Sequence, residues 1–133
     1  MLPVDATTIR LFLHVFAATV WVGGQLTLAG LLPAVRPLGP QATRAIARQF
    51  DRIAWPAFAV LVLTGIWNLV EVDVGDTSTE YQATLGLKLL LVAATGAGAA
   101  VHRVASGRAA LAIGGALSAL AGLGALFVGI QLA

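Results

Sequence analysis

Ionisable side chains interrupt two of the long apolar stretches in the sequence. Arg10 and His14 lie four residues apart in the first stretch, and Lys88 lies in the third. A charge surrounded by apolar side chains is costly unless it is paired or hydrogen-bonded. We therefore treat these residues as candidate functional residues. Trp21 in the first stretch and Asn68 in the second are their candidate companions.

The side-chain types indicate a site for a metal or a metal-containing cofactor. A neutral imidazole such as that of His14 is a common metal and haem ligand. Structural alternatives stay open for each residue. His14 could be a hydrogen-bonded structural histidine, Lys88 could extend its ammonium to the membrane surface along its own stem, and Trp21 could serve packing. His102, beside Arg103, suits an interfacial role.

Apolar helices must position these side chains. The chain of 133 residues is 59% hydrophobic and 11% charged, whereas soluble domains carry about 25% charged residues. A helix needs about 20 apolar residues to cross a bilayer. Four segments qualify, at about residues 8–32, 53–72, 83–102 and 109–133. We expect an all-α, polytopic membrane protein whose residues 1–133 form one domain, a four-helix transmembrane bundle.

The Lys and Arg residues predict the orientation, because loops that carry them stay in the cytoplasm. The first and third loops hold six arginines, and the second loop holds only acidic charges. The arginines are Arg36, Arg44, Arg48, Arg52, Arg103 and Arg108. We expect both termini outside a bacterial-type cytoplasmic membrane. Because the positive charge lies in short loops, nucleic acid is not an expected partner.

Three of the candidate residues share one depth. At a rise of about 1.5 Å per residue, His14 and Lys88 lie roughly 10 and 8 Å below the outer ends of their helices. Asn68 is about four residues from the outer end of its own helix. Three helices therefore contribute polar groups to the outer half of the bundle, where we expect a site formed by His14, Lys88, Arg10, Asn68 and Trp21.

Ligand chemistry favours haem over copper at this site. His14 and His102 differ in depth by roughly 20 Å, which excludes a haem held between these two histidines of one chain. A haem b with His14 as its axial ligand remains, with Lys88 and Arg10 as partners for its propionates. Copper(I) prefers thiolates and thioethers, but the sequence has no cysteine and Met1 is its only methionine. Copper(II) at His14 stays an alternative.

Three segments, taken together, resemble the CopD family, the copper resistance protein D type. They are LHVFAATVWVGGQLTLAGLLPAVR (13–36), FDRIAWPAFAVLVLTGIWNL (50–69) and EYQATLGLKLLLVAATGAGAAVHR (80–103). The resemblance implies copper resistance or copper uptake. The sequence is also similar to the four-helix HemJ type of protoporphyrinogen oxidase. That similarity implies a haem b ligand at His14 and a functional lysine at Lys88.

The leading interpretation is a small membrane protein that binds haem b through His14 and moves electrons at the outer face. Such a protein could be a haem-dependent oxidoreductase. Its partner would be a quinone or a redox protein. The alternatives are copper binding or transport and a non-catalytic assembly partner. The glycine-rich last helix, with Gly115 and Gly122, suits either packing within the bundle or a homodimer.

Overall fold

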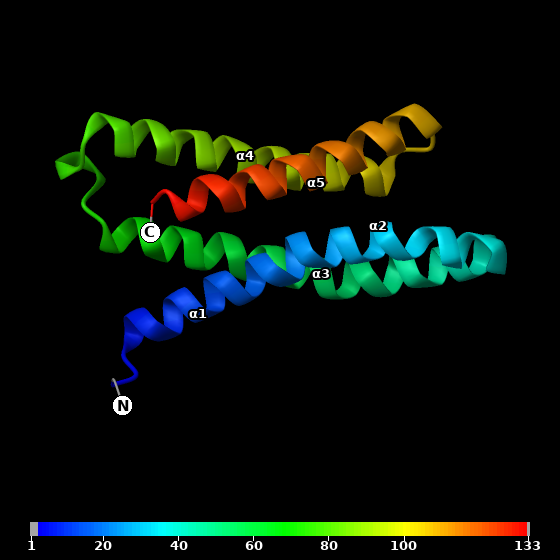
Figure 1. The fold of residues 1–133 in the computed structure, drawn as a ribbon, viewed down its shortest axis with the longest axis horizontal. Helices are drawn as coiled ribbons and strands as arrows, with labels where there is room; N and C mark the ends of the chain where they lie inside the picture. The colour runs from blue at the N-terminus through cyan, green and yellow to red at the C-terminus, as the bar shows by residue number, and fades with distance from the viewer. Residues whose placement is uncertain (1–2, 133) are drawn as a thin grey trace. The chain divides into compact units, whose positions relative to one another are not determined.

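Long helices make up nearly all of the chain in the computed structural model, which describes residues 3–132 (Figure 1). No strand occurs among these residues. The longer elements are α1 (Ala6–Ala18), a π-helical turn η1 (Thr19–Gly23), α2 (Gly24–Val35), α3 (Pro40–Glu71), α4 (Thr79–Val104) and α5 (Arg108–Ile130). Two short 3-10 turns, η2 (Arg36–Leu38) and η3 (Val74–Asp76), lie between them. The all-α prediction is confirmed.

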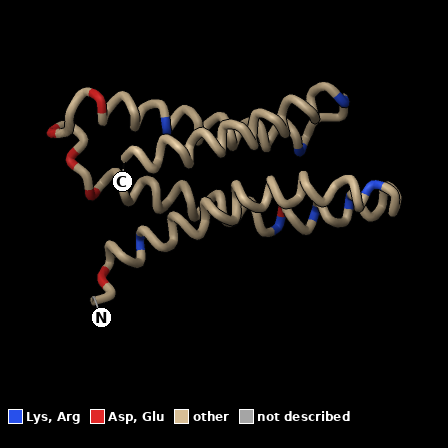
Figure 2. Tube along the Cα trace, in the orientation of Figure 1, with Lys and Arg blue, Asp and Glu red and all other residues tan. Residues whose placement is uncertain are grey.

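Within residues 3–132, four helical rods are long and apolar enough to cross a membrane, namely Ala6–Leu38, Pro40–Glu71, Thr79–Val104 and Arg108–Ile130. Large apolar side chains project from each rod, with exposed fractions of 62% for Phe12, 66% for Leu63, 70% for Leu90 and 69% for Leu120. Charged residues gather toward the rod ends and leave long uncharged stretches between them (Figure 2). Lipid tails can cover such a surface, whereas its exposure to water would be unfavourable in free energy. The protein is a multi-pass membrane protein.

The prolines after the first rod do not end it where the sequence indicates. The predicted end was near residue 32, but α2 continues through Pro33 to Val35. Gly39, with a φ of 98°, makes the turn, and Pro40 begins α3 at a position whose N–H needs no helical partner. The basic segment before residue 53 belongs to the same helix as the second span, so α3 has 32 residues and contains Pro56.

The chain forms two compact units that divide between Val72 and Asp73. In the first unit, α1, η1 and α2 pack along α3. In the second unit, α4 packs along α5. The expectation that all four rods form one bundle stays a prediction, and each unit is described by itself below.

The α4–α5 hairpin depends on close backbone contact. A Cβ added at Gly98 would lie 2.7 Å from the Ser118 nitrogen and 2.8 Å from the Gly114 oxygen. The Thr95 hydroxyl donates to the Ser118 carbonyl at 2.7 Å in the same buried layer. A Cβ at Gly115 would lie 3.1 Å from Nδ1 of His102. The glycines of α5 thus pack against α4, and nothing here supports the homodimer predicted through Gly115 and Gly122.

Candidate functional site

Three pairs of residues join α1 and η1 to α3 in the first unit. An Arg10 guanidinium nitrogen lies 3.7 Å from a Glu71 carboxylate oxygen. Nδ1 of His14 lies 2.9 Å from the Thr64 hydroxyl. The rings of Trp21 and Phe58 lie 4.4 Å apart between centroids. As the residue number increases along the first rod, the number of its contact residue on α3 decreases. The two rods are therefore antiparallel.

The hydrogen bond between His14 and Thr64 has a direction that the other bonds of Thr64 decide. The Thr64 hydroxyl donates to backbone carbonyls of its own helix, at 2.7 Å to Val60 and 3.2 Å to Leu61. Its single proton is thereby used, so its oxygen accepts from Nδ1–H of His14. When an imidazole with its proton on Nδ1 is neutral, its lone pair is on Nε2. Metal-binding histidines usually have this arrangement, in which one ring nitrogen donates to a fixed acceptor and the other holds the metal.

Thr64 is a site residue that the sequence reasoning did not identify. Its side chain is buried, with a relative exposure of 5%. The next residue, Gly65, keeps space for the ring, because a Cβ there would lie 3.5 Å from Cε1 of His14. A signal was present, since Thr64 precedes the candidate Asn68 by four residues and therefore shares its helical face. Asn68 itself is half-buried on α3.

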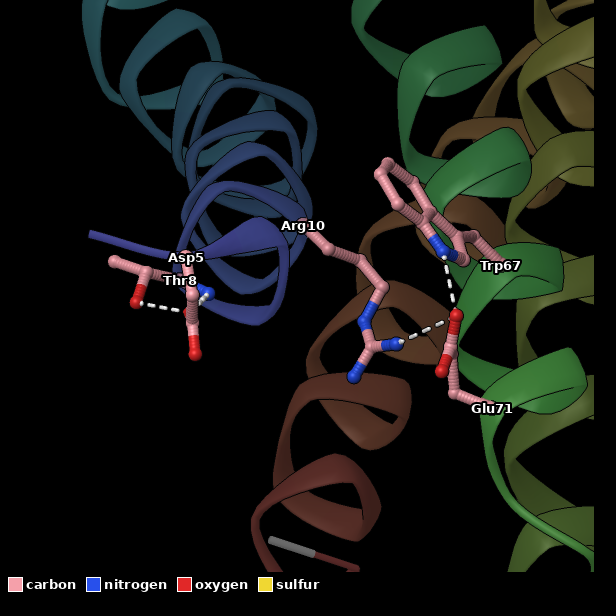
Figure 3. A network of polar contacts seen from close by, with 5 residues as sticks. All are labelled: Asp5, Thr8, Arg10, Trp67 and Glu71. Atoms are coloured by element: carbon pink, nitrogen blue, oxygen red, sulfur yellow. Dashed lines mark hydrogen bonds and ion pairs between the residues drawn. The ribbon is translucent and has the colours of Figure 1, made fainter. Parts of the chain in front are cut away.

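Arg10 belongs to a polar group at the end of α3, shown in Figure 3. Its side chain is 12% exposed, whereas that of Glu71 is 52% exposed. The Trp67 indole donates to the same Glu71 oxygen at 3.1 Å. Nε of Arg10 is buried and has no hydrogen-bond partner among the described residues. Glu71 thus balances a positive charge that lies one helical turn from His14.

The start of α1 is held by Asp5. Its carboxylate accepts from the Thr8 backbone N–H and from the Thr8 hydroxyl, both at 2.8 Å, and this pair also appears in Figure 3. These bonds, the backbone one first, lower the pKa of Asp5. An N-cap of this kind satisfies a helix N–H that would otherwise lack a partner. It fixes where α1 begins, and hence the turn that carries Arg10.

Trp21 lies in the π-helical turn and packs against aromatic rings of α3. It is 2% exposed. Trp55 meets it edge-on at 5.5 Å between centroids, and Phe58 lies tilted against it. Single π turns inside α-helices are often found at functional sites. The sequence reasoning missed this turn. These contacts are packing contacts, and a contact of Trp21 with a cofactor stays a prediction.

The remaining candidates, Lys88 and His102, belong to the second unit. The Lys88 ammonium lies alongside α5, 3.3 Å from where a Cβ of Gly129 would be. Its approach to His14 stays a prediction. Nδ1 of His102 lies 2.6 Å from the Leu111 carbonyl oxygen and therefore donates to it. His102 is exposed next to the turn between α4 and α5, in keeping with an interfacial role.

A resident metal centre is not evident in residues 3–132. No group of three or more His, Cys, Asp or Glu side chains there could hold a metal ion. Stable coordination of a metal ion takes several ligands.

The family model of copper resistance protein D, CopD, matches residues 44–132, more than half of the chain. Glu71, Thr64 and Lys88 lie inside the matched part, whereas Arg10 and His14 precede it. The match confirms the resemblance to CopD, while the similarity to the HemJ type stays a prediction. No curated protein and no solved structure matches the chain.

Proposed function

The chain belongs to the copper resistance protein D family, and from this premise we propose that it passes copper ions through a bilayer along the face between α1 and α3. It is a copper-resistance-related multi-pass membrane protein. Family membership favours copper over haem b, which ligand chemistry alone had ranked first. Haem b, electron transfer and a quinone or redox-protein partner have no support in these findings.

The observation that carries the proposal is the hydrogen bond between His14 and Thr64. It orients the imidazole, and imidazole nitrogen suits copper. Transport requires a site that binds an ion well enough to admit it and weakly enough to release it. A single imidazole without thiolate or thioether ligands meets that requirement better than a closed, multi-ligand site.

Charge near His14 also bears on the proposal. Arg10, one turn away, repels an approaching cation, and the Glu71 carboxylate offsets that repulsion. Glu71 is the more exposed member of the pair, so a cation can meet its carboxylate before it reaches His14. We infer that Arg10 and Glu71 form the mouth of the route and that His14 is the first ligand inside it.

The orientation follows from the arginine bias of the loops. With the arginine-rich connections in the cytoplasm, both termini and the Arg10–Glu71 mouth face outward. The membrane is then the cytoplasmic membrane of a bacterial-type cell, and the route begins at its outer surface. This direction accords with copper uptake rather than export.

Copper flux into proteoliposomes tests the proposal. A copper-responsive dye inside the vesicles reports uptake, measured with copper(II) and, with a reductant present, copper(I). His14→Asn keeps a donor near the Nδ1 position but removes Nε2, so uptake should fall to the level of empty vesicles. His102→Asn is the matched control and should transport normally. Unchanged uptake by a folded His14→Asn protein would refute the route.

Haem b at His14, which ligand chemistry alone favours, is the alternative that an absorption spectrum tests. Purified protein incubated with haem b separates the two. A Soret band that the His14→Asn variant lacks, together with no copper uptake, would favour haem. Absence of a Soret band after haem addition would remove it.

A further inference from the structure

The first rod and α3 stay in contact beyond the aromatic cluster, which consists of Trp21, Trp55 and Phe58. A Cβ added at Gly24 would lie 2.7 Å from Cε2 of Phe50, so α2 packs on α3 at this level. Because the rods are antiparallel, Gln25 follows Gly24 to about the level of Phe50 and Asp51. Two polar side chains, an amide and a carboxylate, thus come to one level on the side of the aromatic cluster away from His14.

The amide of Gln25 is buried without a partner. Its Nε2 is covered and has no hydrogen-bond partner among residues 3–132. Leaving a buried donor unpaired is unfavourable, and a leucine of similar volume would avoid that cost. Rotation about the last side-chain bond exchanges the nitrogen for the carbonyl oxygen, which accepts hydrogen bonds and can bind a cation. The residue type is therefore typical of a place where a polar ligand binds.

Asp51 supplies a carboxylate on the face of α3 that meets the first rod. It precedes Ala54 by three residues and Phe58 by seven, a spacing that keeps the three on one helical face. Ala54 is 1% exposed, and Phe58 packs on Trp21, so this face is the buried one. Asp51 itself is half-buried, whereas Arg52 beside it is exposed. The carboxylate therefore belongs to the contact between the rods and not to the exposed arginine face.

The two groups lie at the cytoplasmic end of the proposed route. Asp51 comes two residues before Ile53, where the apolar stretch of α3 begins. From Thr64, the partner of His14, to Asp51 is thirteen residues, or about 19.5 Å of helix rise. With His14 roughly 10 Å below the outer end of its helix, Asp51 lies at the inner face of a hydrocarbon core about 30 Å thick. The aromatic cluster lies between the two levels.

We propose that Gln25 and Asp51 form an inner ion-binding site, where a copper ion that has passed His14 is held before its release into the cytoplasm. This inference rests on the proposed copper route. The Asp51 carboxylate attracts the cation, and the Gln25 carbonyl oxygen replaces one of its water ligands. Oxygen ligands suit copper less well than imidazole nitrogen does. The ion therefore leaves this site readily, as release at the end of a route requires.

Copper binding and copper uptake test the inner site separately. In detergent, the His14→Asn protein should still bind copper(II), with an electron paramagnetic resonance spectrum typical of oxygen ligands. Gln25→Leu and Asp51→Asn, each added to His14→Asn, should lose that signal. In proteoliposomes, each of these two substitutions in the otherwise unaltered chain should lower copper uptake. Gln49→Leu and Asp76→Asn change the same residue types at exposed positions and should keep both the signal and the uptake.

Normal copper(II) binding and normal uptake in Gln25→Leu and Asp51→Asn would overturn the inner site, while the route through His14 would be unaffected. The amide would then bind only a buried water. A signal that the inner-site variants lose, in a chain that takes up no copper, would support the ion site but refute the proposed function. If Asp51→Asn does not fold, Gln25→Leu alone decides, because leucine fills a similar volume without an unpaired amide.

Discussion

Nδ1 of His14 and the hydroxyl of Thr64 lie 2.9 Å apart across the contact between α1 and α3, although fifty residues separate them in sequence. The Thr64 hydroxyl donates backward to its own helix and accepts from the histidine. The bond determines which imidazole nitrogen presents a lone pair. The proposed copper route depends on it, as does the first prediction.

Thr64→Val should weaken copper handling without removing the ligand. The variant leaves Nδ1–H of His14 without its acceptor, so the ring can rotate or change tautomer. Loss of such a supporting partner typically costs about 10- to 100-fold in metal affinity, and we expect copper uptake at low copper to fall about tenfold. Thr64→Ser keeps the hydroxyl and should behave normally. Equal uptake by the valine and serine variants would contradict the role of the bond.

Glu71→Gln should lower copper uptake by leaving the Arg10 charge uncompensated. Glu71 is 52% exposed, and a glutamine keeps an oxygen that can accept from the Trp67 indole, so the fold should be little affected. Arg10→Gln/Glu71→Gln removes both charges and should recover part of the lost uptake. Together with Arg10→Gln alone and the unaltered chain, these two variants form a double-mutant cycle in the proteoliposome assay. Additive effects of the two substitutions would show that the residues act independently.

Gly98→Ala should separate α4 from α5. A Cβ at this position would come within 2.7 Å of the Ser118 backbone nitrogen, which cannot move aside as a flexible side chain can. We expect a loss of about 1–3 kcal/mol in the free energy of unfolding, measured by denaturation in detergent. Gly86→Ala in the same helix is the control, since nothing lies within 4 Å of its Cβ position. It should be neutral or slightly stabilising, because alanine is the better helix former.

The first turn of α1 should loosen in acid. The hydrogen bonds from Thr8 lower the pKa of Asp5 below its ordinary value of 3.8. Because the carboxyl pKa is lower in the folded form, the ionised carboxylate stabilises the folded form fully at a pH above the ordinary pKa. This stabilisation is lost as the pH falls through the pKa that Asp5 has in the folded form. Amide hydrogen exchange should therefore show the first turn opening below about pH 3.8. In Asp5→Ala the same turn should be loose at every pH, and a pH-dependent opening in that variant would point to another group.

Composition and hydropathy were enough to predict the membrane class, the all-α fold and four apolar rods, because the bilayer fixes how long an apolar helix must be. The ends of α4 and α5 lie close to their expected positions. The end of the first rod lies beyond its expected position, since Pro33 lies inside α2. A proline disrupts a helix less where neighbouring groups or water satisfy the freed carbonyl. The sequence shows the proline but not those neighbours.

The partners of the candidate residues came only from the tertiary structure. A helical period tells which residues share a face, as Arg10, His14 and Trp21 do, but not which helix that face meets or in what register. The contacts with Glu71, Thr64 and Phe58 depend on the antiparallel packing of the first rod on α3, and the π turn at Thr19–Gly23 alters the register within that rod. Side-chain types could therefore nominate His14 as a ligand. Only the packed helices specify the hydroxyl that fixes its tautomer.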